Sequence, residues 1–441
     1  ELISDLSRVR ALKVISRNSA TAVKQRTRDV REIARLVNVR YVLEGSVRHA
    51  GDQLRITAQL IDGVTDAHVW TEKYNGTMGN VFAMQERVSR DIVDALQLTL
   101  TPTGSQHVTE RPILNLVAYE CYLRARQEVH GYTREHLARA DALLERAEAA
   151  AGENALVLAC KAWVHMQRYN LAPGPDRSGL RTATELAERA RALDPACSLA
   201  VLVIALLKPF DGRVVDMLLH LRQALALDPS NVDALTWLGF AYAALGRGDE
   251  ARGPAARAME LDPLSHCPAV AAAWVDYQAG RFAEAGARLA PWVVGPEGVL
   301  HAACIQCIFA LAPLGRLDEM ESLATRYQAS VPNEPLYQYV RFLYFGLQGD
   351  RAGALAELTP ALEEWQRSGH AEYTLHLAQG FAVIGETDRA LACLERTVDL
   401  QYLNHDFLAR HDPLLASLRR DPRFHALLAR VKRAMAAVVT A

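Results

Sequence analysis

The sequence has few aromatic residues, no long apolar run and no excess of charge of one sign. Aromatics are 7% of the 441 residues, and no run of eighteen apolar residues occurs, so no membrane-spanning helix is expected. The 49 basic and 51 acidic side chains leave a net charge of −2. This balance gives no general attraction to nucleic acid or to an anionic membrane.

The cysteines do not form the pattern of a disulfide framework, which would be dense and even-numbered in a short chain. There are seven of them, scattered along the sequence, and this predicts reduced thiols in a cytoplasmic protein. The first residues, Leu2 to Leu12, have helical spacing and no initiating Met precedes them, so we expect further sequence upstream.

Catalytic motifs are also missing. The sequence contains no Walker lysine motif, dinucleotide-binding glycine fingerprint, HExxH or GxSxG. These patterns supply phosphate cradles, zinc ligands and activated nucleophiles. We therefore expect no enzyme activity, no catalytic residue, no cofactor and no metal ion in this chain.

Two groups of residues each leave two interpretations open. Cys304 and Cys307 form a CxxC, with His301 and Cys267 nearby. A zinc site needs four converging ligands, so packing of both thiols inside a helix is favoured over metal binding. The second group comprises His405, His411, His425, Asp406, Asp412 and Asp421. One interpretation is that it binds metal or senses pH. The other, which is favoured, is that its members serve in surface and capping roles.

A repeat of 34 residues is the strongest pattern in the sequence. Leu-Asp-Pro recurs at 193–195, 227–229 and 261–263, and a glycine recurs at nearly the same interval at 212, 246, 280, 315, 349 and 385. Glycine just past a helix end accepts the left-handed conformation that closes the last turn. Proline after Leu-Asp cannot continue a helix, so the preceding helix ends there. The period therefore predicts stacked helix pairs.

Residues 232–265 show the repeat best. Small residues at 239, 251 and 258 allow two helices to approach closely, while Leu238 and Tyr242 fill the space between them. With Gly246 and Pro263, these positions resemble the tetratricopeptide (TPR) repeat. Helix pairs are expected at 115–151, 154–195, 198–229, 232–263, 266–298, 301–332, 335–367 and 371–400. The resemblance implies a mainly α fold, a right-handed TPR α-solenoid of about eight helix pairs.

The N-terminal hundred residues have a different rhythm. Residues 13–16 are a short β-prone run, 29–37 have helical spacing, and 41–49, 54–61 and 68–74 alternate as strands of an antiparallel meander. A helix is expected from Asn80 to about Leu100. The strings YVLEGSVR (41–48), LRITAQLID (54–62) and AHVWTEKY (67–74) resemble the TolB-N-like α/β domain, with its opening strand and loop absent. The resemblance implies a bacterial regulator, whose usual effector is a nucleotide cyclase or a winged-helix DNA-binding domain.

The predicted organisation is a TolB-N-like α/β domain at 1–104, a linker at 105–114, a TPR superhelix at 115–403 and capping helices at 404–441. The first helices of TPR pairs line a concave face that binds peptides or other chains in related proteins. By matching repeat positions, the partner-binding residues should be Asp233, Thr236, Phe240, Val270, Trp274, Tyr277, Ile305, Phe309, Tyr339, Leu343, Glu372 and Gln379.

This lining lacks the Lys and Asn pairing with which some TPR proteins clamp a carboxylate. We therefore expect apolar contacts with a helix or an extended segment, including one from this same chain. The other interpretation is that several of these aromatics are core residues. The leading hypothesis is a non-catalytic scaffold and interaction module of a signalling or transcription regulator. Its partner would be a protein or peptide, its own upstream effector domain, or a second copy in a homo-oligomer. A small-molecule sensor with its ligand beside Trp274, Tyr277 and Phe309 is the alternative, and a nucleotide cyclase that lacks its catalytic domain here is another.

Overall fold

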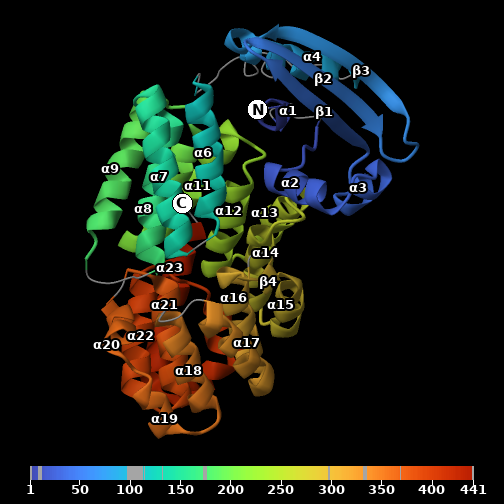
Figure 1. Cartoon of the computed structure of the whole chain (residues 1–441). Helices are drawn as coiled ribbons and strands as arrows, with labels where there is room; N and C mark the ends of the chain where they lie inside the picture. Colours follow the sequence, from blue (N-terminus) through green and yellow to red (C-terminus); the bar gives the residue numbers. More distant parts are fainter. Residues whose placement is uncertain are drawn as a thin grey trace. The chain divides into compact units, whose positions relative to one another are not determined.

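A computed structural model describes residues 2–7, 12–96, 113, 115–131, 133–171, 176–295, 298–330, 335–367 and 369–439. The chain divides into two compact units. Unit 1 contains residues 1–111 together with 228–232 and 258–265, and unit 2 contains residues 112–227, 233–257 and 266–441. Figure 1 labels the helices and strands of both. The predicted domain limits at residues 104 and 403 stay predictions.

Unit 1 contains a three-stranded antiparallel sheet with helix α4 on one face (Figure 1). The strands are β1 (Tyr41–Ala50), β2 (Gln53–Asp62) and β3 (His68–Thr77), in that order, and α4 spans Val81–Ala95. Because side chains alternate along a strand, every second residue of β2 points into the core. Leu54, Ile56 and Ala58 are buried there with Tyr74 of β3 and Val88 of α4. The predicted meander is confirmed.

The short helices of unit 1 are fixed by side-chain caps. Helix α1 spans Leu2–Ser7, α2 spans Arg17–Arg26 and α3 spans Val30–Leu36. Asp29 caps α3 by accepting bonds from the N–H groups of Arg31 and Glu32. The β-prone run at 13–16 is not a strand, because its last residue, Ser16, instead caps α2. Most of the predicted helix beyond Ser7 lies outside the described residues.

Unit 2 is built from eight helix pairs at the predicted positions. They are α6 (Leu116–Val129) with α7 (Arg134–Ala151), α8 (Ala155–Leu171) with α9 (Ser178–Leu193), α10 (Ser198–Leu207) with α11 (Val214–Leu227), α12 (Val232–Ala244) with α13 (Gly248–Leu261), α14 (His266–Gln278) with α15 (Phe282–Leu289), α16 (His301–Leu311) with α17 (Leu317–Ser330), α18 (Pro335–Leu347) with α19 (Arg351–Ala356), and α21 (Ala371–Val383) with α22 (Thr387–Asp399).

Shorter elements join or follow these pairs. They are the 3₁₀ turns η2 (Lys208–Asp211), η3 (Ala290–Trp292), η4 (Ala312–Leu314) and η5 (Glu364–Arg367), the two-residue strands β4 (Val294–Gly295) and β5 (Gly298–Val299), and helix α20 (Pro360–Glu363). After α22 come the π-helical turn η6 (Phe407–His411), the 3₁₀ helix η7 (Pro413–Arg420) and helix α23 (Pro422–Val439). Asp412 and Asp421 therefore lie where one helix stops and the next begins.

The glycines of the period close the first helix of six of the eight pairs in the way the sequence predicts. All six have φ between 65° and 82°, at Gly212, Gly246, Gly280, Gly315, Gly349 and Gly385. A side chain in that region is strained, so glycine is the residue that can follow the helix and still turn. The repeat in the sequence is thus a repeat of backbone conformation.

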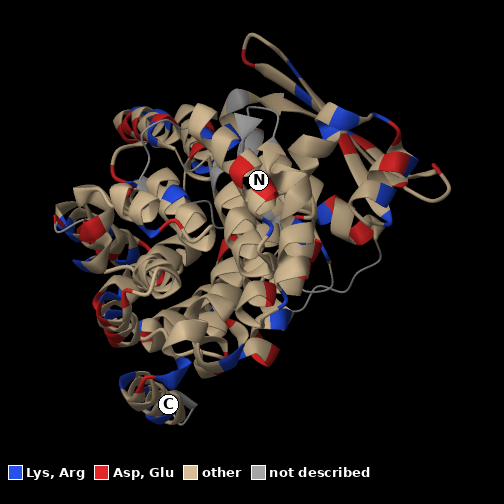
Figure 2. Cartoon of the chain, turned by 90° about the horizontal axis from the view of Figure 1, so that it is seen from below, with Lys and Arg blue, Asp and Glu red and all other residues tan. Residues whose placement is uncertain are grey.

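Three of the first helices carry little charge. Helices α10, α14 and α16 contain a single carboxylate among them, that of Asp276 on α14. In Figure 2 basic and acidic residues are interspersed on the helices, with long uncharged stretches between them. A helix without a polar face, like these three, is typically covered by other elements on most sides. No helix in the described parts of the chain is long and apolar enough to cross a bilayer.

Candidate functional site

Most of the residues predicted to line the concave face are buried in unit 2. Thr236, Val270, Trp274, Tyr277, Ile305, Phe309, Tyr339, Leu343 and Gln379 are all buried. The half-buried members of the set are Asp233, Phe240 and Glu372. The aromatics are therefore core residues of unit 2 as well as residues of its first helices. Their role in binding a partner stays a prediction.

The rings of this face stack from helix to helix. Phe240 of α12 stacks on Trp274 of α14 at 5.7 Å between centroids, and Trp274 stacks on Tyr277 at 5.6 Å. Tyr277 then meets Phe407 of η6 at 5.2 Å. Such contacts contribute about 0.5–1.5 kcal/mol each beyond the area they bury. Phe407 belongs to the C-terminal part of the chain, so a distant segment completes the stack.

That segment, residues 399–412, is here called the closing segment. Its backbone N–H at Leu403 donates to the carbonyl oxygen of Ala244 at 2.8 Å. The Asn404 side-chain amide donates to the carbonyl oxygens of Ala243 at 3.1 Å and Gln278 at 3.2 Å. The last carbonyls of a helix have no partner within the helix. The closing segment therefore caps the C-terminal ends of α12 and α14.

The closing segment also runs past three of the turn glycines. A β-carbon at Gly212 would lie 2.9 Å from the carbonyl oxygen of Asp399, one at Gly246 would lie 3.2 Å from Cα of Asn404, and one at Gly280 would lie 3.0 Å from Cβ of His411. At Gly315, Gly349 and Gly385 no described atom lies within 4 Å of the same position. The closing segment thus follows the three successive turns at Gly212, Gly246 and Gly280 and leaves the turns at Gly315, Gly349 and Gly385 uncovered.

A buried polar cluster, here called the closing cluster, ties the segment to α14 and α21. It consists of Tyr277, His376, Gln379 and Asp412. The Gln379 amide donates to the Tyr277 hydroxyl at 3.0 Å and to the Asp412 carboxyl at 2.7 Å. These two bonds use both amide hydrogens of Gln379. Its amide oxygen can only accept, and it accepts a hydrogen bond from Nδ1 of His376 at 2.9 Å. This assigns the proton of His376 to Nδ1.

Burial decides the ionisation of the closing cluster. It lowers the pKa of His376 to about 4, opposed in part by the bond to Gln379. It raises the pKa of Asp412 to about 6, although bonds from Gln379 and from the Leu414 N–H oppose the shift. Burial likewise raises the pKa of the half-buried Glu372 to about 7. Each shift favours the neutral form, as removal from water requires.

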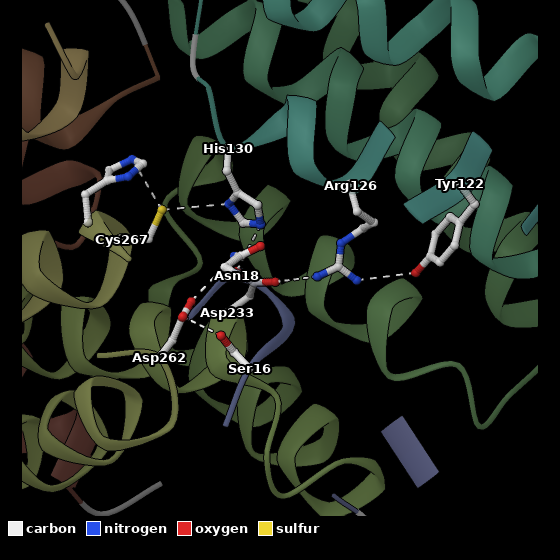
Figure 3. A network of polar contacts seen from close by, with 9 residues as sticks. Ser16, Asn18, Tyr122, Arg126, His130, Asp233, Asp262 and Cys267 are labelled. Atoms are coloured by element: carbon white, nitrogen blue, oxygen red, sulfur yellow. Dashed lines mark hydrogen bonds and ion pairs between the residues drawn. The ribbon is translucent and has the colours of Figure 1, made fainter. Parts of the chain in front are cut away.

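A second cluster of unit 2, here called the thiol cluster, joins α6, α12 and α14 (Figure 3). It consists of Arg126, His130, Asp233, His266 and Cys267. Arg126 Nη2 lies 2.7 Å from the Asp233 carboxylate, and Nε2 of His130 lies 3.6 Å from its other oxygen. Nδ1 of His130 lies 3.8 Å from Sγ of Cys267, and Nε2 of His266 lies 3.6 Å from the same sulfur.

In the thiol cluster a charge outweighs burial. Burial disfavours the charged ring of His130, but the Asp233 carboxylate and the Cys267 sulfur favour it more, so the pKa of His130 is raised. The ring also meets Trp163 of α8 edge to face at 5.4 Å, which holds its orientation. The sequence predicts Asp233 as a residue of the concave face, and it indicates Cys267 only as a neighbour of the CxxC. His130, 103 residues before Asp233, gave no local signal.

Figure 3 also draws a separate cluster inside unit 1. There the buried carboxylate of Asp262 accepts hydrogen bonds from Ser16 and from Ser19, the latter at 2.6 Å, and the N–H of Leu264 donates to the Ser19 hydroxyl at 2.9 Å. The Leu-Asp-Pro motif at 261–263 therefore has a second use, because its aspartate binds the first turn of α2.

The described side chains of the two groups with metal-ligating residues do not converge on one point. Sγ of Cys304 lies 3.8 Å from the carbonyl oxygen of Leu323 and Sγ of Cys307 lies 4.0 Å from that of Gly286. Burial raises the pKa of these thiols to about 12 and about 11. His405 lies beside Asp406 at 3.2 Å, whereas Asp412 belongs to the closing cluster. Within the described residues no three His, Cys, Asp or Glu side chains gather as metal ligands.

A surface cavity of about 210 Å³ lies at the closing segment. Its lining consists of Gly246, Asn404, His405, Asp406, Lys432 and Met435. The three rings predicted beside a small-molecule ligand, Trp274, Tyr277 and Phe309, do not line it; they pack on each other, on His376 and on Phe407.

Comparisons with known proteins agree with this repeat architecture. Residues 218–246 match the family model described as "TPR repeat". Over 129 residues the chain is 44% identical to the protein named "Putative adenylate cyclase 3" of Rhizobium meliloti (strain 1021), which is 29% of this chain. The match takes in 22% of that relative, so the chain spans about a fifth of its length.

Several solved structures are also similar to this chain. They include a Rap protein in complex with competence and sporulation factor (TM-score 0.49, 11% identity, 73% of this chain and 99% of that one). The Cut9–Hcn1 hetero-tetramer of APC/C gives a TM-score of 0.46 at 13% identity, over 80% and 76% of the two chains. The pilus biogenesis factor PilW gives 0.33 at 17%, over 52% and 98%.

The repeat match falls on the part of the chain where the period is clearest, since residues 218–246 run from α11 through α12 to the turn at Gly246. Repeats of this kind are typically non-catalytic and serve as scaffolds for protein–protein interaction. The helix pairs, the positive φ angles of the turn glycines and the matched repeat agree: residues 218–246 match a tetratricopeptide repeat, unit 2 is a mainly α array of helix pairs with that period, and the chain joins it to a small three-stranded antiparallel sheet.

Proposed function

We propose that this chain is the interaction and regulatory module of a bacterial signalling protein, and that it binds a partner protein through the concave face of its TPR repeats. The first helices supply that face, and it carries rings and aliphatic side chains with few charges. An occupant would be an apolar helix or an extended segment, because those shapes offer side chains to a surface of this kind.

The observation that carries the proposal is the closing segment. Residues 399–412 lie against three repeats as a bound peptide would, with backbone and amide donors on the C-terminal carbonyls of α12 and α14 and with Phe407 on Tyr277. A face that takes an internal segment in this way has the chemistry to take an external one. Binding of a partner would then compete with residues 399–412.

The regulatory part of the proposal is supported by the relative from Rhizobium meliloti. Its name is that of an adenylate cyclase, and the 129 matched residues are 44% identical. The TolB-N-like strings at 41–74 lie in the three strands of unit 1. We infer that the partner is a signalling protein of the bacterial cytoplasm, with a nucleotide cyclase as the first candidate. A winged-helix regulator or a second copy of this chain is the alternative partner.

Photo-crosslinking in a bacterium that carries this gene tests the proposal. A benzoylphenylalanine at position 240 replaces a half-buried residue of the concave face, and the control places it at Leu219, which is 52% exposed on the second helix α11. We expect a covalent product with one signalling protein from position 240 and none from position 219. Identical products from both positions, or none from 240, would contradict a concave-face partner.

A variant of the closing segment tests the competition. Asn404→Ala removes the donors to the carbonyl oxygens of Ala243 and Gln278, so the partner should crosslink from position 240 in higher yield. The matched control is Arg423→Gln, which breaks an exposed ion pair with Asp388 on the outer helices. An equal yield in both variants would show that residues 399–412 do not compete with the partner.

A further inference from the structure

The seven cysteines of the chain divide into six that are buried and one that is not. All seven are free thiols, and Cys267 is the half-buried one. Burial raises the pKa of the thiols of Cys160, Cys304 and Cys393 to about 12 and that of Cys197 to about 11. Thiols in such surroundings are inert packing groups. Only Cys267 combines access to solvent with polar neighbours.

The neighbours of Cys267 form a relay of three groups. Sγ of Cys267 lies 3.8 Å from Nδ1 of His130, and Nε2 of that ring lies 3.6 Å from Oδ1 of Asp233. If Nε2 carries the ring proton and points it at the carboxylate, Nδ1 is left as the acceptor for the thiol proton. A nucleophile, a base and a carboxylate that orients the base are the parts that activate a thiol.

Two further features support a reactive sulfur at this place. Nε2 of His266 lies 3.6 Å from the same Sγ. Cys267 is also the second residue of the thirteen-residue helix α14, and the positive end of a helix favours a thiolate. The Asp233 carboxylate is itself held by Arg126 at 2.7 Å, which fixes the relay from its far end.

We propose that Cys267 is a redox modification site, which a hydroperoxide oxidises to a sulfenic acid with His130 as the base and Asp233 as the group that orients it. This goes beyond the proposed partner binding and does not depend on it. The sulfur attacks one peroxide oxygen, the S–O bond forms and the O–O bond breaks. Sulfur loses two electrons and the peroxide gains them. The thiol proton passes through Nδ1 of His130 to the leaving oxyanion, which departs as water when the oxidant is hydrogen peroxide and as an alcohol when it is an organic hydroperoxide.

The other charged and titratable groups around the sulfur come from every helix that packs here. Helix α6 supplies Arg126 and Tyr122, whose hydroxyl lies 3.3 Å from Arg126 Nη1. Helix α12 supplies Asp233, and α14 supplies His266. Helix α8 supplies the Trp163 ring and the thiol of Cys160, which burial keeps protonated. The reaction rate should therefore rise with pH as the imidazole of His130 loses its proton.

The test uses the whole chain and hydrogen peroxide. Sulfenic acid is trapped with a dimedone probe, and the labelled cysteine is located by mass spectrometry over a range of pH. We expect label on Cys267 at least about tenfold faster than on any other cysteine of the folded chain, since a positioned base contributes at least that much. Label spread over several cysteines, or a slower rate at Cys267 than at Cys121, would overturn the proposal.

Variants separate the relay from simple exposure. His130→Gln keeps a donor toward Asp233 but removes the base, so the rate at Cys267 should fall about tenfold. Its control is Cys393→Ser, a buried thiol of α22, which should leave that rate unchanged. Cys267→Ser should abolish the fast label in either background. If His130→Gln reacts as fast as the native chain at every pH while its circular dichroism is native, the thiol is merely exposed and the relay is wrong.

Discussion

His376 and His130 lie in two polar clusters of unit 2 and show opposite preferences for charge. In the closing cluster His376 donates to an amide oxygen, and burial lowers its pKa to about 4. In the thiol cluster His130 faces the Asp233 carboxylate, and its pKa is raised in spite of burial. The comparison shows that a neutral partner does not offset the cost of burying a charge, whereas a carboxylate does. In the closing cluster His376 is therefore held neutral, whereas in the thiol cluster the protonated form of His130 is favoured.

The largest expected effect removes the ring that joins the closing segment to Tyr277 of α14. Phe407 is fully buried and lies against Tyr277 and Tyr402. Phe407→Ala should lower the free energy of unfolding by about 3–5 kcal/mol, because it leaves a cavity among packed rings. Urea denaturation measures it, with Leu219→Ala as an exposed control that should change stability by less than about 0.5 kcal/mol.

The same variant sharpens the comparison between the clusters. If the closing segment is a separate lock, Phe407→Ala should leave the rate of thiol oxidation at Cys267 unchanged in the folded chain. A loss of stability no larger than that of Leu219→Ala would mean that residues 399–412 do not hold the concave face.

The turn glycines give the next largest effect and separate covered repeats from uncovered ones. Gly246 and Gly315 have φ of 72° and 65°, so alanine at either should cost about 1 kcal/mol in backbone strain. At Gly246 the new methyl group would also meet Met435 at 3.1 Å and Asn404 at 3.2 Å. Gly246→Ala should therefore cost about 1–3 kcal/mol more than Gly315→Ala. Thermal unfolding of the two variants measures the difference, and equal losses would contradict a closing segment seated on that turn.

The sequence predicts the elements of this fold well because its signals are local. The glycines at 246 and 315 both mark a helix end with positive φ, and the strands at 41–50 and 53–62 follow the alternation in the printed sequence. The closing segment has no such signal. Leu403 bonds to Ala244, some 160 residues earlier, and nothing in the local pattern of either residue specifies the other.

The candidate site was predicted in part for the same reason. Trp274 and Tyr277 were placed on the first helices from the repeat alone, and both lie there, but the repeat could not indicate what covers them. Asp412 was grouped with nearby histidines because they are close in sequence. It instead accepts a hydrogen bond from Gln379 of α21, 33 residues earlier, and the local sequence around Asp412 does not specify that partner.

The third effect is a change in the pH dependence of stability. The folded-state pKa of His376 is about 4, against a usual value of 6.5. Above pH 6.5 the ring is neutral in both states, and its contribution is fully present. As pH falls from 6.5 toward 4 the unfolded chain takes up the proton first, so the contribution of His376 to stability falls by up to about 1.4 kcal/mol per pH unit.

His376→Asn tests this, because an asparagine amide can donate to Gln379 and does not titrate. We expect the variant to be less stable by about 2 kcal/mol at pH 7.5 through lost ring packing, and the gap should narrow as the pH approaches 4. The matched variant Phe309→Leu removes the ring that stacks on His376 at 3.9 Å but keeps the histidine. A constant gap for both variants would show that His376 is not the group that titrates.

The smallest expected change in stability comes from a substitution in the thiol cluster, at Asp233. Asp233→Asn keeps the size of the side chain but removes the charge that favours protonated His130, so the pKa of His130 should fall and the ring should come to resemble His376. The change in unfolding free energy should be about 1 kcal/mol, since hydrogen bonds to Arg126 can persist. Titration of the His130 ring proton by NMR measures the pKa directly, with the exposed Asp388→Asn as control. A pKa that does not move would mean that another charge than Asp233 sets the ionisation of His130, and the contrast between the two clusters would then need a different cause.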